Sequence, residues 1–302
     1  MARVVFMGSP EFAVPSLRAL TRQYDVVGVV TQPDRPAGRG RELRPPALKE
    51  EAGKIGIPVI QPDKLVNPQA LDQIRAWAPD VIVVAAFGQI LKPEMLELPR
   101  HGCVNVHASL LPRWRGAAPI QAAIAAGDAQ SGVTIMKMDV GMDTGGILAQ
   151  TNVPIGPDET GGSLTGRLAS IGAELLIATL AEFLSGRLQP QPQDPEKATK
   201  APLLKKEDAA LNTLVAAVDL ERRVRAYNPW PGAYTEVGNM RLIVHRAHVA
   251  RTTAPSGSRQ IIDDLPAIAT KDGALVLDEV QPPGKKRMNG RDYLRGARGW
   301  TA

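Results

Sequence analysis

Short apolar runs alternate with helical patterns over the first two hundred residues. The strand candidates are Val4–Met7, Val26–Val30, Val81–Ala86, Cys103–Val106, Val133–Met138 and Ile147–Val153. The first three are continuous and rich in Val and Ile, which is typical of parallel strands buried on both faces. The helical patterns cover Phe12–Leu20, Pro46–Ala52, Pro68–Ala76 (with Asn67 as its expected N-cap) and Ser163–Leu184. This alternation predicts a doubly wound, Rossmann-like α/β domain with its site at the carboxyl ends of the strands.

The composition changes after this region. Residues 189–200 contain three prolines and almost nothing apolar, which predicts a semi-rigid linker. A helical stretch, Leu214–Tyr227, is followed by β-like runs at Arg241–Val249, Ile261–Leu265, Ala267–Thr270 and Ala274–Gln281. Closely spaced strands after one helix predict a small OB-like barrel, a fold that often holds nucleic acid. We therefore expect an α/β domain over residues 1–188, a linker over residues 189–204 and a barrel domain over residues 205–302.

The excess of positive charge is confined to the last third of the chain. Residues 1–202 contain 20 Lys and Arg and 20 Asp and Glu, whereas residues 203–302 contain 16 and 11. Within the neutral part, the segment from Arg35 to Lys49 has five basic residues and only Glu42 as an acidic one. Two basic regions indicate a polyanionic partner. Solubility alone explains the same counts equally well.

Cysteine usage and hydropathy bear on the compartment. Cys103 is the only cysteine, so no disulfide can form within the chain, which fits a reducing cytoplasm. The apolar run near Met1 is too short for a signal peptide, and no stretch approaches the roughly 18 apolar residues that would span a membrane. We expect a cytoplasmic protein with no membrane partner.

Three polar side chains near the ends of apolar runs are the candidate chemistry. Asn105 and His107 are two residues apart, so on an extended strand both side chains point to the same face. Asp143 lies in Gly-Met-Asp-Thr-Gly. No Ser or Cys stands in a recognisable activating context, so the pattern indicates a pocket in which two bound substrates react with each other.

Transfer of a one-carbon acyl group to an amine is one reaction that fits. The Asn105 amide and a His107 N–H would stabilise the developing oxyanion. Asp143 would take the proton of the attacking amine, directly or through a water molecule. Taken singly, each residue has a commoner structural explanation: a strand terminator, a hydrogen-bonded histidine and a turn carboxylate. Only their conjunction favours chemistry.

Nucleotide and metal sites are the alternatives. Gly8 follows the first strand, but the G-x-G-x-x-G series is missing and Pro10 removes a backbone donor where one is wanted. His245 and His248 are three apart, which on a strand sends them to opposite faces. We expect no metal.

Five motifs resemble the folate-dependent formyltransferase family. The two central ones are Asn105–Gln121 (NVHASLLPRWRGAAPIQ) and Asp139–Gly145 (DVGMDTG). The three others are Thr31–Gly40 (TQPDRPAGRG), Phe87–Leu91 (FGQIL) and Tyr227–Ala233 (YNPWPGA). The resemblance spans both expected domains and most of the chain.

The resemblance implies an enzyme that takes a formyl group from N10-formyltetrahydrofolate and needs no metal. The implied acceptor is the amino group of methionine on initiator tRNA, and the reaction would serve translation initiation. The residues that match the family's catalytic ones are Asn105, His107 and Asp143. The residues that match its folate contacts are Ser109, Leu110, Leu111, Pro112, Phe87 and Gln89. The residues that match its tRNA-contacting arm are Arg35, Arg39 and Arg41. The second domain matches the family's barrel-like tRNA-binding domain, and the size of the RNA favours a monomer.

Two other functions stay open at this point. A formyltransferase for a small amine or sugar, or a hydrolase of the same folate, needs the three catalytic residues but has no obvious use for the Arg39 loop and a basic second domain. A tRNA-binding protein without catalysis needs no Asp143 in a pocket.

Overall fold

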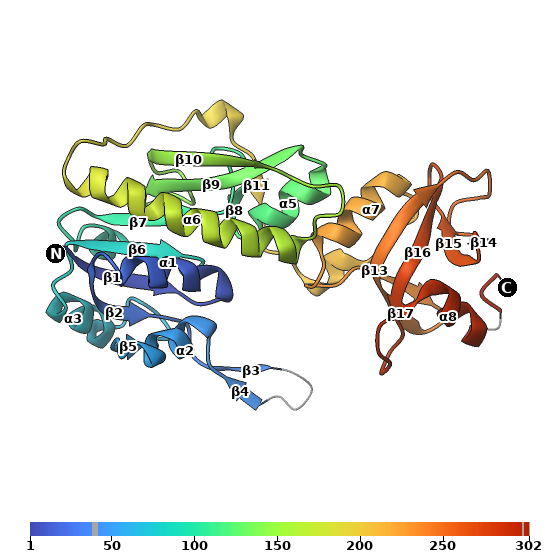
Figure 1. Ribbon diagram of the computed structural model, residues 1–302, viewed down its shortest axis with the longest axis horizontal. Helices are drawn as coiled ribbons and strands as arrows, with labels where there is room; N and C mark the ends of the chain where they lie inside the picture. The colour runs from blue at the N-terminus through green and yellow to red at the C-terminus, as the bar shows by residue number, and fades with distance from the viewer. Residues whose placement is uncertain (38–41, 298, 302) are drawn as a thin grey trace. The chain divides into compact units, whose positions relative to one another are not determined.

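A seven-stranded sheet forms the centre of the first part of the chain in the computed structural model, which describes residues 1–37, 42–297 and 299–301 (Figure 1). The strand order is β10-β9-β7-β6-β1-β2-β5. The strands are β1 Arg3–Gly8, β2 Asp25–Val30, β5 Val59–Ile60, β6 Val81–Ala85, β7 Cys103–His107, β9 Gln130–Lys137 and β10 Ile147–Pro154. From β5 to β7 neighbouring strands are parallel, which confirms the doubly wound sheet.

One edge of this sheet departs from the all-parallel prediction. β9 runs antiparallel to β7, with His107 opposite Thr134. β9 is buried along almost its whole length, and β10 lies beyond it. A buried apolar run has the same pattern in either direction, so the sequence predicts that these residues form strands but not which way they point.

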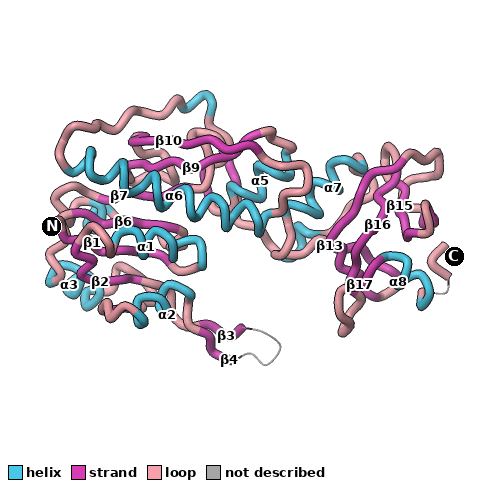
Figure 2. The backbone as a smooth tube through the Cα atoms, viewed as in Figure 1, coloured by secondary structure: helices cyan, strands magenta, loops and turns pink. Residues whose placement is uncertain are grey.

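Helices cover the sheet (Figure 2), and all of them except Pro93–Leu96 fall on helical patterns of the sequence. They are the 3-10 helix Glu11–Ala13 and the α-helices α1 Val14–Leu20, α2 Ala47–Lys54, α3 Pro68–Ala76, α4 Pro93–Leu96 and α6 Gly161–Leu184. The expected cap of α3 is confirmed, because the Asn67 side chain accepts the Gln69 N–H at 3.0 Å. A Cβ added at Gly172 would lie only 2.9 Å from a methyl of Val106, so α6 packs closely on β7.

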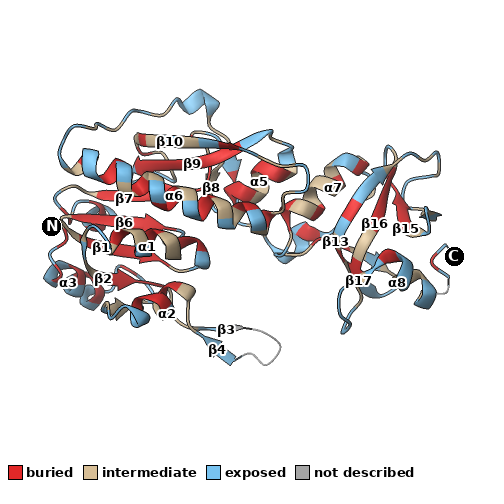
Figure 3. Ribbon diagram, viewed as in Figure 1, coloured by how far each residue is buried: buried red, intermediate tan, exposed pale blue. Residues whose placement is uncertain are grey.

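The central strands of the sheet form the core. β1, β6 and β7 are buried along nearly their whole length (Figure 3). The side chains on one face include Met7, Ile82 and Cys103, which pack with residues of the segments that follow β6. A strand buried this deeply holds the polar residues at its end rigidly.

The compact units of the structure divide the chain differently from the expected domains. Unit 1 contains Met1–Pro119, Ser131–Val153 and Thr165–Ala201, and unit 2 contains Ile120–Gln130, Pro154–Leu164 and Pro202–Ala302. Most of the expected linker therefore groups with unit 1. A proline-rich composition predicts an extended backbone, but it does not tell against which surface that backbone lies.

Unit 2 contains a curled antiparallel sheet of barrel type, as predicted. Its strands are β12 Tyr234–Val237, β13 Met240–Ala250, β14 Arg259–Ile262, β15 Leu265–Ala269, β16 Ala274–Gln281 and β17 Met288–Asn289. They follow the order β12-β13-β16-β15-β14, with β17 beside β16. Two helices, α7 Ala217–Ala226 and α8 Gly290–Gly296, accompany the sheet. The pattern analysis missed β12, β17 and α8 of this unit, the helix α5 Pro119–Ala126, and β5 and α4 of unit 1. No helix in the described ranges is long and apolar enough to cross a membrane.

Cys103 provides a first prediction. It is 1% exposed, and burial raises the pKa of its thiol to about 12. Because the thiolate is the reactive form, only about one molecule in 10⁴ carries it at pH 8. We expect the native protein to resist a thiol-specific reagent such as DTNB and to react stoichiometrically once guanidinium unfolds it. Rapid labelling in buffer alone would show that β7 opens readily.

Candidate active site

The candidate residues lie at the carboxyl edge of the parallel strands. β6 and β7 pair in parallel with Val84 opposite Asn105, so both strands end at the same edge of the sheet. The loop after β6 carries Phe87, and β1 is the other neighbour of β6. The edge beside β1 and β6 is where the strand order reverses, which is the usual place for a ligand in this fold.

His107 lies at the end of β7 and is 6% exposed. Its Nε2 lies 3.0 Å from the carbonyl oxygen of Trp114. A carbonyl only accepts hydrogen bonds, so Nε2 carries a proton and donates it there. Nδ1 is left to face Asp143, whose Oδ1 lies 3.6 Å away. The nitrogen that can gain or lose a proton is therefore Nδ1.

Asn105 differs from His107 in its surroundings. It is 9% exposed and shares the face of β7 that carries His107, two residues on. Among the residues that the structure describes, none makes a hydrogen bond with its carboxamide. A buried amide without a partner inside the protein is a donor ready for a ligand.

Asp143 reaches across from the turn between β9 and β10. Its Oδ2 accepts the Gly116 N–H at 2.8 Å. The turn itself is closed by a different carboxylate, that of Asp139, which accepts from the Gly141 N–H at 3.0 Å and the Thr144 hydroxyl at 2.6 Å. Asp143 is thus not the turn-forming carboxylate of this motif. Its side chain is 16% exposed, so a small molecule can reach it.

The segment from Ser109 to Pro112 is fixed by residues that the sequence analysis missed. The Thr134 hydroxyl donates to the Ser109 carbonyl at 2.6 Å and accepts the Leu111 N–H at 3.1 Å. The Gln150 amide donates to the Leu111 carbonyl at 2.9 Å. Thr134 is a polar residue inside a buried apolar run, and this feature of the sequence could have identified it as a residue that supports the site. The Ser109 hydroxyl is itself engaged with the Arg113 carbonyl at 2.7 Å, so its role is internal.

Phe87 and Gln89 make contacts inside the protein, next to the carboxyl edge of the sheet. Phe87 is buried in the core of unit 1, and its carbonyl accepts from the Gln32 amide at 3.1 Å. Gln89 accepts the Leu65 N–H at 3.0 Å and donates to the Asp63 carbonyl at 3.3 Å. Its amide therefore joins two loops.

The basic segment is described only at its base. β3 Arg35–Ala37 pairs with β4 Glu42–Arg44 as a hairpin. Arg35 is exposed, and its guanidinium donates to the Gln32 side chain at 3.0 Å. Since Gln32 also contacts the Phe87 carbonyl, one side chain connects the hairpin to the loop after β6. Arg39 and Arg41 lie outside the described residues.

The two histidines that the sequence analysis weighed as metal ligands have other partners. His245 pairs with Gln281 at 3.0 Å and His248 with Asp278 at 2.9 Å. Burial lowers the pKa of His245. Among the described residues, no three His, Cys, Asp or Glu side chains are placed to hold an ion.

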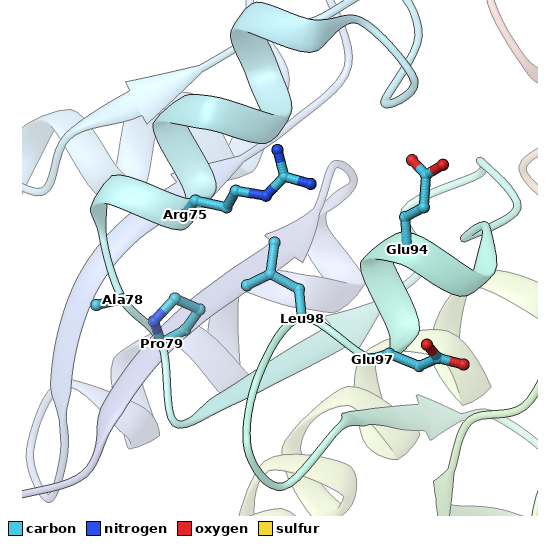
Figure 4. A pocket seen from close by; sticks show the side chains of 6 residues that line it. All are labelled: Arg75, Ala78, Pro79, Glu94, Glu97 and Leu98. Carbon is cyan, nitrogen blue, oxygen red and sulfur yellow. The ribbon is translucent and has the colours of Figure 1, made fainter.

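A pocket of about 400 Å³ lies elsewhere in unit 1. Figure 4 shows its lining: Arg75, Ala78, Pro79, Glu94, Glu97 and Leu98. Pro79 precedes β6 and Leu98 precedes β7, so this pocket is at the amino ends of the strands. It contains none of the candidate residues, and its location argues against a part in their chemistry.

Comparison with known proteins decides the family. Residues 2–180 match the formyl transferase family, and residues 203–298 match the formyl transferase C-terminal domain. The chain belongs to the formyl transferase family. The methionyl-tRNA formyltransferase of Myxococcus xanthus (strain DK1622) is 50% identical, with 97% of this chain and 95% of the relative covered. That of Halorhodospira halophila (strain DSM 244 / SL1) is also 50% identical, covering 98% and 97%.

Solved structures show the same fold at lower identity. The methionyl-tRNA formyltransferase from Clostridium thermocellum has a TM-score of 0.57 and 18% identity, covering 82% of this chain and 93% of that one. WlaRD, a sugar 3N-formyl transferase crystallised with dTDP and 5-N-formyl-THF, has a TM-score of 0.68 and 18% identity, covering 95% and 99%. The fold is therefore shared by enzymes with different acceptors.

The contacts of Asp143 generate a second prediction. Asp143→Asn keeps the side chain's shape and an acceptor for the Gly116 N–H but removes the charge that faces His107. We expect the rate of formyl transfer to fall by about 10²–10⁴-fold, the range for loss of a general base, with substrate affinities nearly unchanged.

Single-turnover rates and separate binding titrations would measure these effects. Asp139→Asn is the matched control, because it alters a carboxylate of the same turn that does not face His107. Normal turnover by Asp143→Asn would remove Asp143 from the chemistry.

Proposed function

We propose that this enzyme transfers the formyl group of N10-formyltetrahydrofolate to the free amino group of methionine on initiator tRNA. The observation that carries this proposal is a sequence identity of 50% to two methionyl-tRNA formyltransferases, over nearly the whole length of this chain and of each relative. The relatives that carry it are named for the same acceptor, methionyl-tRNA.

The residues at the strand ends suit direct attack of the amine on the formyl carbon. As the C–N bond forms, the carbonyl oxygen becomes an oxyanion, and the unoccupied Asn105 amide is the donor for it. Loss of one such donor typically costs about 10²–10³ in rate. The bond from the formyl carbon to N10 then breaks, N10 takes a proton, and tetrahydrofolate leaves.

His107 and Asp143 accept the proton that the attacking amine loses. An α-amino group has a pKa of about 7.7–8.0, so most of it is protonated at pH 7 and a base must accept the proton. The Nε2–H of His107 donates to the Trp114 carbonyl, so this N–H is not available to stabilise the oxyanion. Nδ1 of His107 and the Asp143 carboxylate together form the accepting pair.

The folate is held mainly by the shape and the apolar surface of the site. The Ser109 hydroxyl and the Gln89 amide are both used inside the protein, so they build the walls of the site. Leu110 and Pro112 are partly exposed and offer apolar surface to the donor, while Leu111 and Phe87 are buried supports behind them.

The acceptor is bound through its phosphates. Arg35 is an exposed cation at the base of the hairpin, and Arg39 and Arg41 belong to the same segment. The surplus of basic residues after Leu203 extends this capacity to unit 2. In unit 2 Trp230 is 51% exposed, whereas Tyr227 and Tyr234 are buried, so of these three aromatic residues Trp230 is the one available to a base. The enzyme acts as a cytoplasmic monomer, free of membranes, in this proposal.

A transfer assay tests the function directly. The enzyme is incubated with N10-formyltetrahydrofolate labelled in the formyl group and with either methionyl initiator tRNA or free methionine. Label on the charged tRNA alone establishes the reaction and the need for the RNA. Folate consumption without label on either acceptor would point to a hydrolase or another amine, and no consumption would point to a binding protein.

Salt dependence provides a third prediction. Phosphate contacts release counterions, so the logarithm of tRNA affinity should fall linearly with the logarithm of salt concentration. Arg35→Ala should weaken binding and reduce that slope by about 1. Filter-binding or fluorescence titrations between 50 and 200 mM salt, about the range over which such contacts are strongly weakened, would measure it.

Arg75→Ala is the control for this titration, because Arg75 is an exposed arginine paired with Asp72 near the amino ends of the strands. Its slope should equal that of the unaltered protein. A slope near zero for the unaltered protein would contradict phosphate binding altogether.

A further inference from the structure

Residues 189–201, called the strap here, are fastened to unit 1 near both ends. Near its start, Gln191 exchanges two backbone hydrogen bonds with Ile147, at 2.7 and 2.8 Å. At its end, β11 Lys200–Ala201 pairs in parallel with β8 Arg115–Gly116. A Cβ at Gly146 would lie 2.6 Å from the Cβ of Pro190, so the strap passes close to the segment that follows Asp143.

Gln193, in the middle of the strap, uses both ends of its side-chain amide. Nε2 donates to the carbonyl of Asp143 at 2.9 Å and to the carbonyl of Gly145 at 2.7 Å. Oε1 accepts two N–H groups of the Arg115 guanidinium, at 3.0 and 2.8 Å. Both donor hydrogens are thereby satisfied, and the acceptor binds a charged donor, which makes for stronger hydrogen bonds.

The backbone that Gln193 holds is unusual. Asp143 has φ 54°, a left-handed conformation that is uncommon for residues other than glycine. Fixing the carbonyls of Asp143 and Gly145 fixes the peptide planes that follow each of them. These planes set the direction in which the Asp143 side chain leaves the turn.

β8 closes the network from the other side. Arg115 binds Gln193, and the next residue, Gly116, donates its N–H to the Asp143 carboxylate. Asp143 is therefore held at its backbone by the strap and at its side chain by β8. The remaining carboxylate oxygen, Oδ1, is the one that faces His107.

We propose that Gln193 is a positioning residue that keeps the Asp143 carboxylate facing His107 during formyl transfer. The role rests on the proposed function, since Asp143 is taken as part of the proton-accepting pair. A residue in the expected linker thus acts on the reaction through two backbone carbonyls, about fifty residues away in sequence.

Two substitutions separate this role from simple support of Arg115. Gln193→Ala removes all four hydrogen bonds. Gln193→Glu keeps an oxygen for Arg115 but has no N–H for the two carbonyls. We expect both variants to lose kcat by about 10²-fold, the effect of a misplacement of about 1 Å, with both KM values within a few-fold of the original.

Gln191→Ala is the matched control. Gln191 is an exposed glutamine of the same strap whose side chain bonds only to the Gln189 carbonyl, so kcat should not change. Full activity of Gln193→Glu would assign Gln193 to holding Arg115 and overturn the proposal. Full activity of a folded Gln193→Ala would also overturn it.

A double-mutant cycle tests whether the effect passes through Asp143. In the Asp143→Asn background, Gln193→Ala should cost little further activity. Fully multiplicative losses would show that Gln193 acts elsewhere and would overturn the proposal. Thermal unfolding of each variant identifies any loss of folded protein.

NMR of the His107 imidazole gives a readout that needs no acceptor. We expect Gln193→Ala to change the pH titration of His107 in the same direction as Asp143→Asn does, and Gln191→Ala to leave it unchanged. An unaltered titration in Gln193→Ala would overturn the positioning role. If the unaltered enzyme transfers no formyl group, the proposed function fails, while this measurement still decides whether Gln193 controls the pair.

Discussion

The approach of His107 Nδ1 to Asp143 Oδ1, at 3.6 Å, is the contact on which the site depends. The two residues come from different structures, the end of a buried strand and a tight turn. Neither can adjust alone: Nε2 of His107 is tied to the Trp114 carbonyl and Oδ2 of Asp143 to the Gly116 N–H. Since Trp114 and Gly116 are two residues apart, a single short segment sets both sides of the pair.

The polar groups behind this pair obey the rule that buried donors and acceptors must be satisfied. Thr134 and Gln150 bind the backbone of the Ser109–Pro112 segment from β9 and β10. This support explains the presence of Thr134 and Gln150 in these two edge strands. The Asn105 carboxamide has no hydrogen-bond partner among the described residues, and an available amide at the proposed substrate site is a functional exception rather than a structural fault.

The sequence predicted every strand of the seven-stranded sheet except the two-residue β5, and it singled out the candidate residues, because both depend on local pattern. Val4–Met7 and Val81–Ala86 are continuous apolar runs, and the spacing of Asn105 and His107 fixes their common face. The direction of β9, the carbonyl partner of His107 and the role of Gln193 could not be predicted. Each depends on which distant segments meet, and a local pattern carries no information about that.

The proline-rich strap is held to the rest of unit 1 by few backbone hydrogen bonds. Pro190, Pro192 and Pro195 have no N–H, so this segment cannot form a long strand ladder with unit 1. Side chains add to the few backbone pairs: the Gln193 amide donates to the Asp143 and Gly145 carbonyls, and the Thr199 hydroxyl accepts the Trp114 N–H at 2.9 Å.

Proline also restricts the unfolded chain, so ordering such a segment loses less conformational entropy than ordering a flexible one. A segment that loses little entropy on ordering can be held by a few hydrogen bonds. The composition that indicates a spacer between domains is therefore equally suited to a rigid support, and the polar side chains between the prolines distinguish the two.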